Sequence, residues 1–201
     1  MRGLIYKNIR LSFLAPKINY LLGAFAVGMS FIGSSPIIGV LFFSFVVSTI
    51  STYCFYPEYK CGWNKYGNIL PLKKWQNIAG KYLSSLIFVL ISGLGGLLIN
   101  TIYAITTQES SLDIVVLSMG IAIAFPVFWT SFFLPVVFKM GIQSVSYFRL
   151  LLIPAMFLLR NFTGTDLTLS NYLFVSVLIL LCFIILGLSF LVTVLITGKR
   201  L

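Results

Sequence analysis

Most of the side chains that could take part in binding or chemistry lie in one polar segment, residues 58–81, between two long apolar stretches. The segment contains five lysines, two tryptophans and one acid: Lys60, Lys65, Lys73, Lys74, Lys81, Trp63, Trp75 and Glu58. Ammonium groups attract carboxylates and phosphates, and large aromatic side chains dominate the energetics of protein interfaces. The pattern therefore predicts a loop that contacts a soluble partner, and an elbow on the membrane surface without a partner is the alternative.

Residue types needed for catalysis or metal binding are scarce. The chain has no histidine and only four acids, and its cysteines, Cys54, Cys61 and Cys182, form no paired motif. A serine–histidine–aspartate set is therefore impossible, and a dedicated zinc site is not expected. Gly80-Lys81 is followed by tyrosine and lacks the upstream spacing of a phosphate-binding loop. We therefore expect a chain that is not an enzyme by itself and that holds no metal or cofactor.

Composition predicts the fold class. Hydrophobic residues make up 59% of the chain and charged residues 9%, with a mean hydropathy of +1.05. A soluble domain has roughly 25% charged residues, and the apolar runs do not alternate with the period of two that membrane strands require. We expect an all-α integral membrane protein with one transmembrane domain over residues 1–201.

The apolar stretches accommodate six transmembrane helices of the usual length. These are expected at residues 18–32, 36–56, 82–106, 114–138, 142–159 and 172–197. Residues 1–16 are expected to form an interfacial helix, because Arg2, Lys7, Arg10 and Lys17 share one arc of a helical projection. An extension of span one is the alternative.

The basic residues predict the orientation. With the N-terminus inside, thirteen of the fourteen lysines and arginines lie on the inner side, and only Arg160 lies outside. This split follows the positive-inside rule. The prediction is a multi-pass protein of the cell membrane with both termini in the cytoplasm. It also accounts for the net charge of +10 without a nucleic-acid partner.

Several residues inside the expected spans can be interpreted in structural or in functional terms. Arg149 either snorkels to the interface or makes a polar contact in a translocation path. Five glycines in the first and third spans are expected to permit close helix packing: Gly23, Gly28, Gly93, Gly95 and Gly96. Three prolines are expected to kink their helices or serve as hinges: Pro126, Pro135 and Pro154.

Two segments carry a family resemblance. The polar segment contributes Glu58, Gly62, Trp63, Tyr66, Leu70, Pro71, Lys81 and Tyr82, and a later segment reads LPVVFKMG, residues 134–141. With the span layout, these segments resemble small type-2 ABC exporter permeases, which have the first pattern in their intracellular loop and commonly have Leu-Pro followed by Lys-Phe-Gly at the second. The chain is similar to the subfamily that includes exporters of phenol-soluble modulins and antimicrobial peptides, although Lys73, Lys74 and Asn77 depart from its pattern.

The resemblance implies a permease subunit that moves an amphipathic peptide or another hydrophobic substrate out of the cell. A separate cytoplasmic ATPase would bind ATP and Mg, and a second copy or a sister permease would complete the unit. A coupling helix between spans two and three would dock on the ATPase. The residues expected to contribute are Glu58, Gly62, Trp63, Lys65, Tyr66, Leu70, Pro71, Lys73, Lys74, Trp75, Lys139 and Gly141. Pro71 suits the first position of a helix that continues to Lys81, with its lysines facing lipid phosphates or acidic groups of the partner.

Three other classes remain open from the sequence. A vitamin-binding subunit of an energy-coupling importer also has about six spans and no ATP site, but the outer segments here are short for a lid over a ligand. A bacteriocin immunity membrane protein is another alternative. A membrane-embedded enzyme is disfavoured by the missing histidines and intramembrane acids. The substrate does not follow from the sequence.

Overall fold

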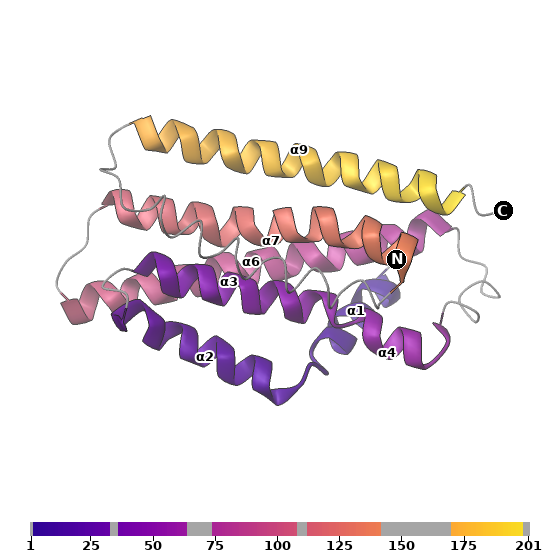
Figure 1. Ribbon diagram of the computed structural model, residues 1–201, viewed down its shortest axis with the longest axis horizontal. Helices are drawn as coiled ribbons and strands as arrows, with labels where there is room; N and C mark the ends of the chain where they lie inside the picture. The colour runs from indigo at the N-terminus through magenta and orange to yellow at the C-terminus, as the bar shows by residue number, and fades with distance from the viewer. Residues whose placement is uncertain (1, 33–35, 64–73, 108–111, 142–169, 199–201) are drawn as a thin grey trace.

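The computed structural model describes residues 2–32, 36–63, 74–107, 112–141 and 170–198 (Figure 1). Its helices are α1 (Arg2–Ser12), α2 (Lys17–Ile32), α3 (Pro36–Thr52), α4 (Phe55–Lys60), α6 (Lys74–Thr107), α7 (Leu112–Met140) and α9 (Ser170–Gly198). All regular structure in these ranges is helical, which confirms the predicted all-α class.

The long helices form an elongated bundle (Figure 1). Helices α3, α6 and α7 contact one another and make its centre, while α2 lies along α3 and α9 lies along α7. The short α1 packs against α6 and α3 at one end of the bundle, beside α4. We call this end the α1 end. It therefore gathers segments from the beginning, the middle and the end of the chain.

Helices α7 and α9 run in the same direction, and both finish at the α1 end (Figure 1). The expected fifth span, residues 142–159, lies outside the described residues. The parallel arrangement of its two neighbours is compatible with the predicted order of spans.

Four described stretches are long and apolar enough to cross a membrane: Pro36–Lys60, Trp75–Thr107, Ile114–Met140 and Val175–Thr197. They correspond to the expected spans two, three, four and six. Helix α2, the expected span one, has 16 residues. At 1.5 Å per residue it is about 24 Å long, which is less than the ~30 Å hydrocarbon thickness of a bilayer. The described part of the chain therefore supports four full spans of the six predicted.

Two predicted boundaries differ from the structure. The sequence predicts a loop helix up to Lys81 and a new span from Tyr82, but α6 passes through both residues without a break. The drop in hydropathy before Tyr82 marks a polar first turn of one long helix. Conversely, the expected span two is divided by a turn at Tyr53 and Cys54, after which α4 begins.

Glycines bring the central helices into close contact. A Cβ atom on Gly95 would lie 2.0 Å from the ring of Phe43, and one on Gly96 would lie 2.8 Å from the Cβ of Ala122. The predicted packing role of the glycines in span three is therefore confirmed. On α2, by contrast, a Cβ on Gly28 would meet nothing within 4 Å. Helix α7 continues through both of its prolines, Pro126 and Pro135.

Neutral polar side chains join the helices inside the apolar part of the bundle. Ser92 on α6 donates a hydrogen bond to the carbonyl oxygen of Ala122 on α7 at 2.7 Å, and its Oγ lies 3.1 Å from Ser44 Oγ on α3. The Nδ2 of Asn100 donates to Ser118 Oγ at 2.7 Å. These buried groups have partners within the bundle, as groups surrounded by hydrocarbon require.

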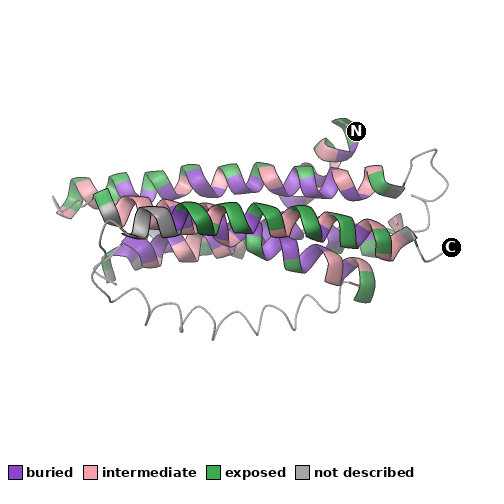
Figure 2. Cartoon of the chain, turned by 90° about the horizontal axis from the view of Figure 1, so that it is seen from above, coloured by how far each residue is buried: buried purple, intermediate pink, exposed green. Residues whose placement is uncertain are grey.

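Helix α9 is the most exposed of the four full-length spans (Figure 2). Only 17% of its most apolar window is buried, compared with 67% for Pro36–Lys60. Its exposed side chains are almost all aliphatic: Leu180, Leu181, Ile184, Leu188, Leu191 and Leu195. This composition is typical of a helix face that contacts lipid hydrocarbon.

Candidate functional site

A buried carboxylate organises the α1 end of the bundle. Lys7 on α1 donates a hydrogen bond from Nζ to Glu58 Oε1 at 2.6 Å, and Lys81 on α6 donates from Nζ to Glu58 Oε2. The side chains of Glu58 and Lys81 are only 5% and 4% exposed. One acid on α4 thus holds two cations from helices that are distant in the sequence.

Aromatic rings cover both cations. Lys7 Nζ lies 3.7 Å from the ring centroid of Trp63, and Lys81 Nζ lies 3.6 Å from that of Phe55. The ring of Phe138, near the end of α7, is 5.8 Å from Lys81 Nζ. Ring faces attract cations most strongly where water is excluded. We refer to Lys7, Glu58, Lys81 and the rings of Phe55 and Trp63 as the Glu58 cluster.

The cluster carries an excess of positive charge, because one carboxylate faces two ammonium groups. Burial lowers the pKa of Lys7, and the hydrogen bond from Lys7 to Glu58 opposes this effect. Removal of one partner from a buried ion pair typically costs about 3–5 kcal/mol, since it leaves an uncompensated charge. Each member of the cluster therefore depends on the others.

The sequence of α1 explains how Lys7 reaches Glu58. Leu4, Asn8 and Ser12 recur at four-residue spacing and are all buried, so they form one inward face. Leu4 packs over Gly80, where an added Cβ would lie 3.3 Å from the Cβ of Leu4. Ser12 Oγ donates to the carbonyl oxygen of Ser51 on α3 at 3.1 Å. The sequence predicts one arc shared by Lys7 and the other cations of α1, but Lys7 turns to the interior, where it pairs with Glu58.

A buried apolar layer, which includes Phe55 itself, adjoins the ion pairs of the Glu58 cluster. It comprises the buried side chains Cys54, Phe55, Ile78, Tyr82, Trp129, Phe133, Leu134 and Val137. The ring of Phe55 stands edge-on to those of Phe133 and Phe138, with centroids 6.3 and 5.8 Å apart. The rings and aliphatic groups exclude water from one side of the ion pairs and so strengthen them.

Two glycines from the segments that resemble the permease family terminate helices at the α1 end. Gly62 has φ +65° and follows α4, and Gly141 has φ +83° and follows α7. The N–H of Gly62 donates to the carbonyl oxygen of Tyr59 at 3.2 Å, and that of Gly141 to the carbonyl oxygen of Val137 at 2.9 Å. Glycine adopts this left-handed conformation without steric cost and often terminates helices.

The two tryptophans of the predicted coupling segment have different environments. Trp63 lies against Lys7 and is partly buried, whereas Trp75, in the first turn of α6, is 45% exposed. Trp75 is therefore accessible for a partner, while the ring of Trp63 is already in contact with its own chain. Lys139 is exposed at the end of α7, on the same end of the bundle.

Several predicted site residues lie outside the described ranges, so their roles stay predictions. These are Lys65, Tyr66, Leu70, Pro71 and Lys73 of the coupling segment and Arg149 of the expected fifth span. Lys74 begins α6, and its side chain is likewise not described.

Two expectations about this segment are corrected. Its ends were placed outside the bundle, but Glu58 and Lys81 are buried in it. Lys81 was expected to reach lipid or a partner's acid, but it pairs with Glu58 of its own chain. Lys7 and Phe55 were missed as site residues. A usable signal was present, because Glu58 is the one acid among the cations of the expected inner side.

No group of three potential metal-ligating side chains occurs within the residues that the structure describes. The Glu58 cluster joins α1, α4, α6 and the end of α7 to one another, so its role in the structure is mechanical. A displacement of any one of these helices would therefore act on the other three.

Comparison with known proteins identifies the family. The model of the family described as "ABC-2 family transporter protein" matches residues 3–198, nearly the whole chain. Searches of curated proteins and of solved structures found no match. Permeases of this family are generally non-catalytic membrane subunits, and the family implies a partner ABC ATPase. The chain therefore belongs to the ABC-2 transporter family, and it is a multi-pass membrane permease subunit of an ABC transporter.

Proposed function

We propose that this permease works in an ATP-driven exporter that moves an amphipathic or hydrophobic substrate, a peptide in the first instance, out of the cell. A separate cytoplasmic ATPase binds ATP and Mg in this proposal. Family membership and the lack of a phosphate-binding loop in the sequence support the assignment of ATP binding to a separate subunit. The resemblance to peptide exporters supports the direction and the substrate class.

The orientation in this proposal places the α1 end in the cytoplasm. Both chain termini lie toward this end (Figure 1). Thirteen of the fourteen lysines and arginines belong to the termini and connections assigned to it, in accord with the positive-inside rule. The ATPase would therefore approach from the side of the Glu58 cluster.

The observation that carries the proposal is the continuity of α6 from the α1 end into the bundle. Trp75 is exposed in its first turn, whereas Lys81 is buried two turns later and paired with Glu58. A push on the exposed turn would pass along one unbroken helix into the third span. Through Glu58 it would also reach α4 and α1. In this mechanism Trp75 contacts the ATPase, and the Glu58 cluster keeps the moving helices together.

The unit proposed for transport contains two permeases, either two copies of this chain or this chain with a sister subunit. The substrate would be held between them by apolar contacts, since the described spans expose mainly aliphatic and aromatic side chains. Membrane lipids would cover the remaining apolar faces. No nucleic-acid partner is part of this proposal.

The test compares two truncations on the same helix. Trp75→Ala removes an exposed ring at the proposed docking end, and Ile105→Ala removes a side chain that is 79% exposed near the other end of α6. The tagged chain is purified from its own membranes, and the amount of ABC ATPase recovered with it is measured by mass spectrometry. Truncation of a central interface tryptophan costs roughly 2 kcal/mol or more.

We expect Trp75→Ala to reduce recovery of the ATPase at least tenfold and Ile105→Ala to leave it unchanged. Because Trp75 is exposed, both variants should fold and reach the membrane in normal amounts. Equal recovery of the ATPase with both variants would reject Trp75 as the docking residue. Recovery of no ATPase with the parent chain would contradict the proposed function as a whole.

A further inference from the structure

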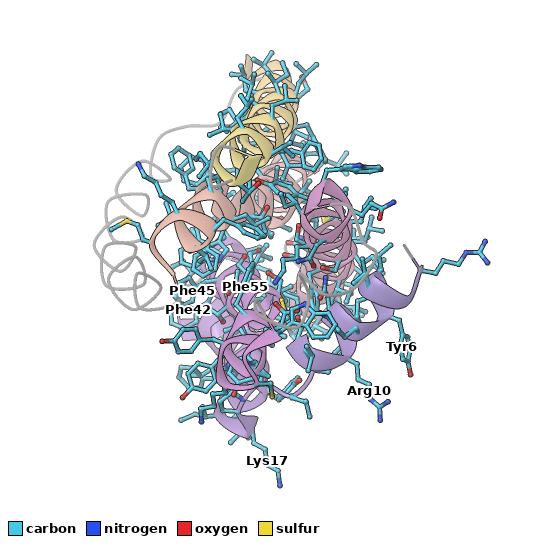
Figure 3. All side chains as sticks on the ribbon, turned by 90° about the vertical axis from the view of Figure 1, so that its right-hand side faces the viewer. Tyr6, Arg10, Lys17, Phe42, Phe45 and Phe55 are labelled. Atoms are coloured by element: carbon cyan, nitrogen blue, oxygen red, sulfur yellow. The ribbon has the colours of Figure 1, made fainter. Side chains whose placement is uncertain are left out.

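The two sides of α1 have opposite chemistry. Its inner side is buried against α6 and α3, and Lys7 is engaged by Glu58. Its outer side carries Arg2, Tyr6 and Arg10, all exposed, with Tyr6 67% exposed. Figure 3 shows Tyr6 and Arg10 directed away from the bundle. The outer side is therefore available to a surface beyond this chain.

This exposed surface continues across the junction into the start of α2. Phe13 is 51% exposed and Lys17 is exposed, and Figure 3 shows Lys17 directed outward as well. The hydroxyl of Tyr20 donates a hydrogen bond to the carbonyl oxygen of Phe13 at 2.8 Å, which holds the junction in place. We define the α1 outer face as Arg2, Tyr6, Arg10, Phe13 and Lys17.

No acid of the described residues is paired with the three cations of this face. Glu58 is engaged by Lys7 and Lys81 on the inner side of α1. Asp113 belongs to the beginning of α7, at the opposite end of the bundle from α1 (Figure 1). The remaining acids, Glu109 and Asp166, lie outside the described ranges. The α1 outer face therefore presents positive charge that this part of the chain leaves uncompensated.

We propose that the α1 outer face binds the phosphate headgroups of anionic phospholipids. Guanidinium and ammonium groups match phosphate oxygens, and tyrosine and phenylalanine are suited to the boundary between headgroups and acyl chains. The face adjoins α2, whose exposed side chains Ile18 and Leu21 are apolar, so headgroup and acyl chain would meet adjacent surfaces. This inference concerns lipid recognition and is independent of the substrate or the direction of transport.

The experiment uses the full chain in mild detergent, without the ATPase. Native mass spectrometry measures binding of phosphatidylglycerol and of phosphatidylcholine with identical acyl chains. The variants are Arg10→Gln and the triple variant Arg2→Gln, Arg10→Gln, Lys17→Gln. The matched control is Lys60→Gln, which removes one exposed cation at the same end of the bundle. Arg10→Lys tests whether charge alone suffices.

We expect the parent to bind phosphatidylglycerol more tightly than phosphatidylcholine. Each removed cation should weaken phosphatidylglycerol binding roughly fivefold, which corresponds to about 1 kcal/mol. Lys60→Gln should leave binding unchanged, and Arg10→Lys should retain most of it. Higher salt should weaken the preference of the parent, because exposed charges are screened. If the triple variant is not monodisperse, Arg10→Gln decides the question.

Three results would overturn the proposal. One is equal binding of the two lipids by the parent, and another is an equal loss of phosphatidylglycerol binding in Lys60→Gln and Arg10→Gln. The third is a triple variant that binds phosphatidylglycerol as the parent does but no longer recovers the ABC ATPase from membranes. That outcome would identify the face as a protein contact.

Discussion

The Glu58 cluster and the polar contacts inside the apolar part of the bundle both hold α6, but by different chemistry and against different helices. At the α1 end, α6 is held by a buried ion pair between Lys81 and Glu58. Further along, α6 is held by neutral groups, Ser92 and Asn100, which hydrogen-bond to α3 and α7. In these two sets of contacts, the charged groups lie at the α1 end and the groups further along the bundle are neutral, as the cost of desolvating a charge favours.

The difference matters because the two kinds of contact respond differently to loss of a partner. A serine or threonine hydroxyl can bond to a carbonyl oxygen of its own helix, as Thr193 does to Ser189 at 2.8 Å. The ammonium group of Lys81 has no such neutral alternative and is almost fully buried. We therefore expect the stability of the bundle to be most sensitive at the Glu58 cluster.

The strongest test of this comparison is Glu58→Gln. The change keeps the shape of the side chain but leaves Lys81 buried without a counter-charge, and Lys7 loses its partner. We expect the free energy of unfolding to fall by about 3–5 kcal/mol. The measurement is denaturant unfolding of the purified chain in detergent micelles.

Two matched variants sharpen this result. Lys60→Gln removes an exposed charge on the same helix and should change stability by less than about 0.5 kcal/mol. The double variant Glu58→Met, Lys81→Met replaces the buried pair by apolar groups and should recover most of the loss. If Glu58→Gln is as mild as Lys60→Gln, the ion pair does not hold the helices together.

The long helices of the bundle could be predicted from the sequence because each contains a long apolar run. Helices α7 and α9 begin and end close to the expected limits, and α3 begins at the expected residue. The continuity of α6 was missed, because hydropathy falls between Lys74 and Lys81 although nothing there stops a helix. Hydropathy measures how strongly side chains prefer water or hydrocarbon. Helix termination depends instead on backbone conformation, as at Gly62 and Gly141.

The site was harder to predict than the fold. A single acid among many lysines indicates that some pair will form, but it does not specify which lysine, since Lys7 is 51 residues away from Glu58 in the sequence. The different environments of Trp63 and Trp75 also depend on a contact between residues that are distant in the sequence. The two side chains are similar in sequence context, and only the docking of α1 beside α4 brings Lys7 over Trp63.

A smaller effect is expected where glycine permits close packing inside the apolar part. A Cβ atom on Gly39 of α3 would lie 2.7 Å from the backbone oxygen of Ala26 on α2 and closer still to Ser30 Oγ. Gly39→Ala should therefore push α2 away from α3 and cost about 1–3 kcal/mol in the same unfolding measurement. Gly28→Ala is the control, because a Cβ there meets nothing within 4 Å. Equal effects of the two changes would show that the α2–α3 contact is loose.

The smallest effect is expected from a neutral hydrogen bond, that of Tyr82. Its hydroxyl lies 2.7 Å from Ser189 Oγ and 3.0 Å from Thr193 Oγ1, and it connects α6 to α9. In Tyr82→Phe the two α9 hydroxyls keep other acceptors, since Ser189 also donates to the carbonyl oxygen of Ser131 at 2.5 Å.

We expect Tyr82→Phe to lower the free energy of unfolding by about 0.6 kcal/mol and by no more than about 1.7 kcal/mol, the range measured for hydrogen bonds between membrane helices. Tyr59→Phe, which removes a hydroxyl from a side chain 58% exposed on α4, should have no measurable effect. A loss in Tyr82→Phe as large as that in Glu58→Gln would abolish the proposed difference between charged and neutral contacts. It would also mean that α9, which buries little of its surface, depends on this one hydroxyl for its attachment.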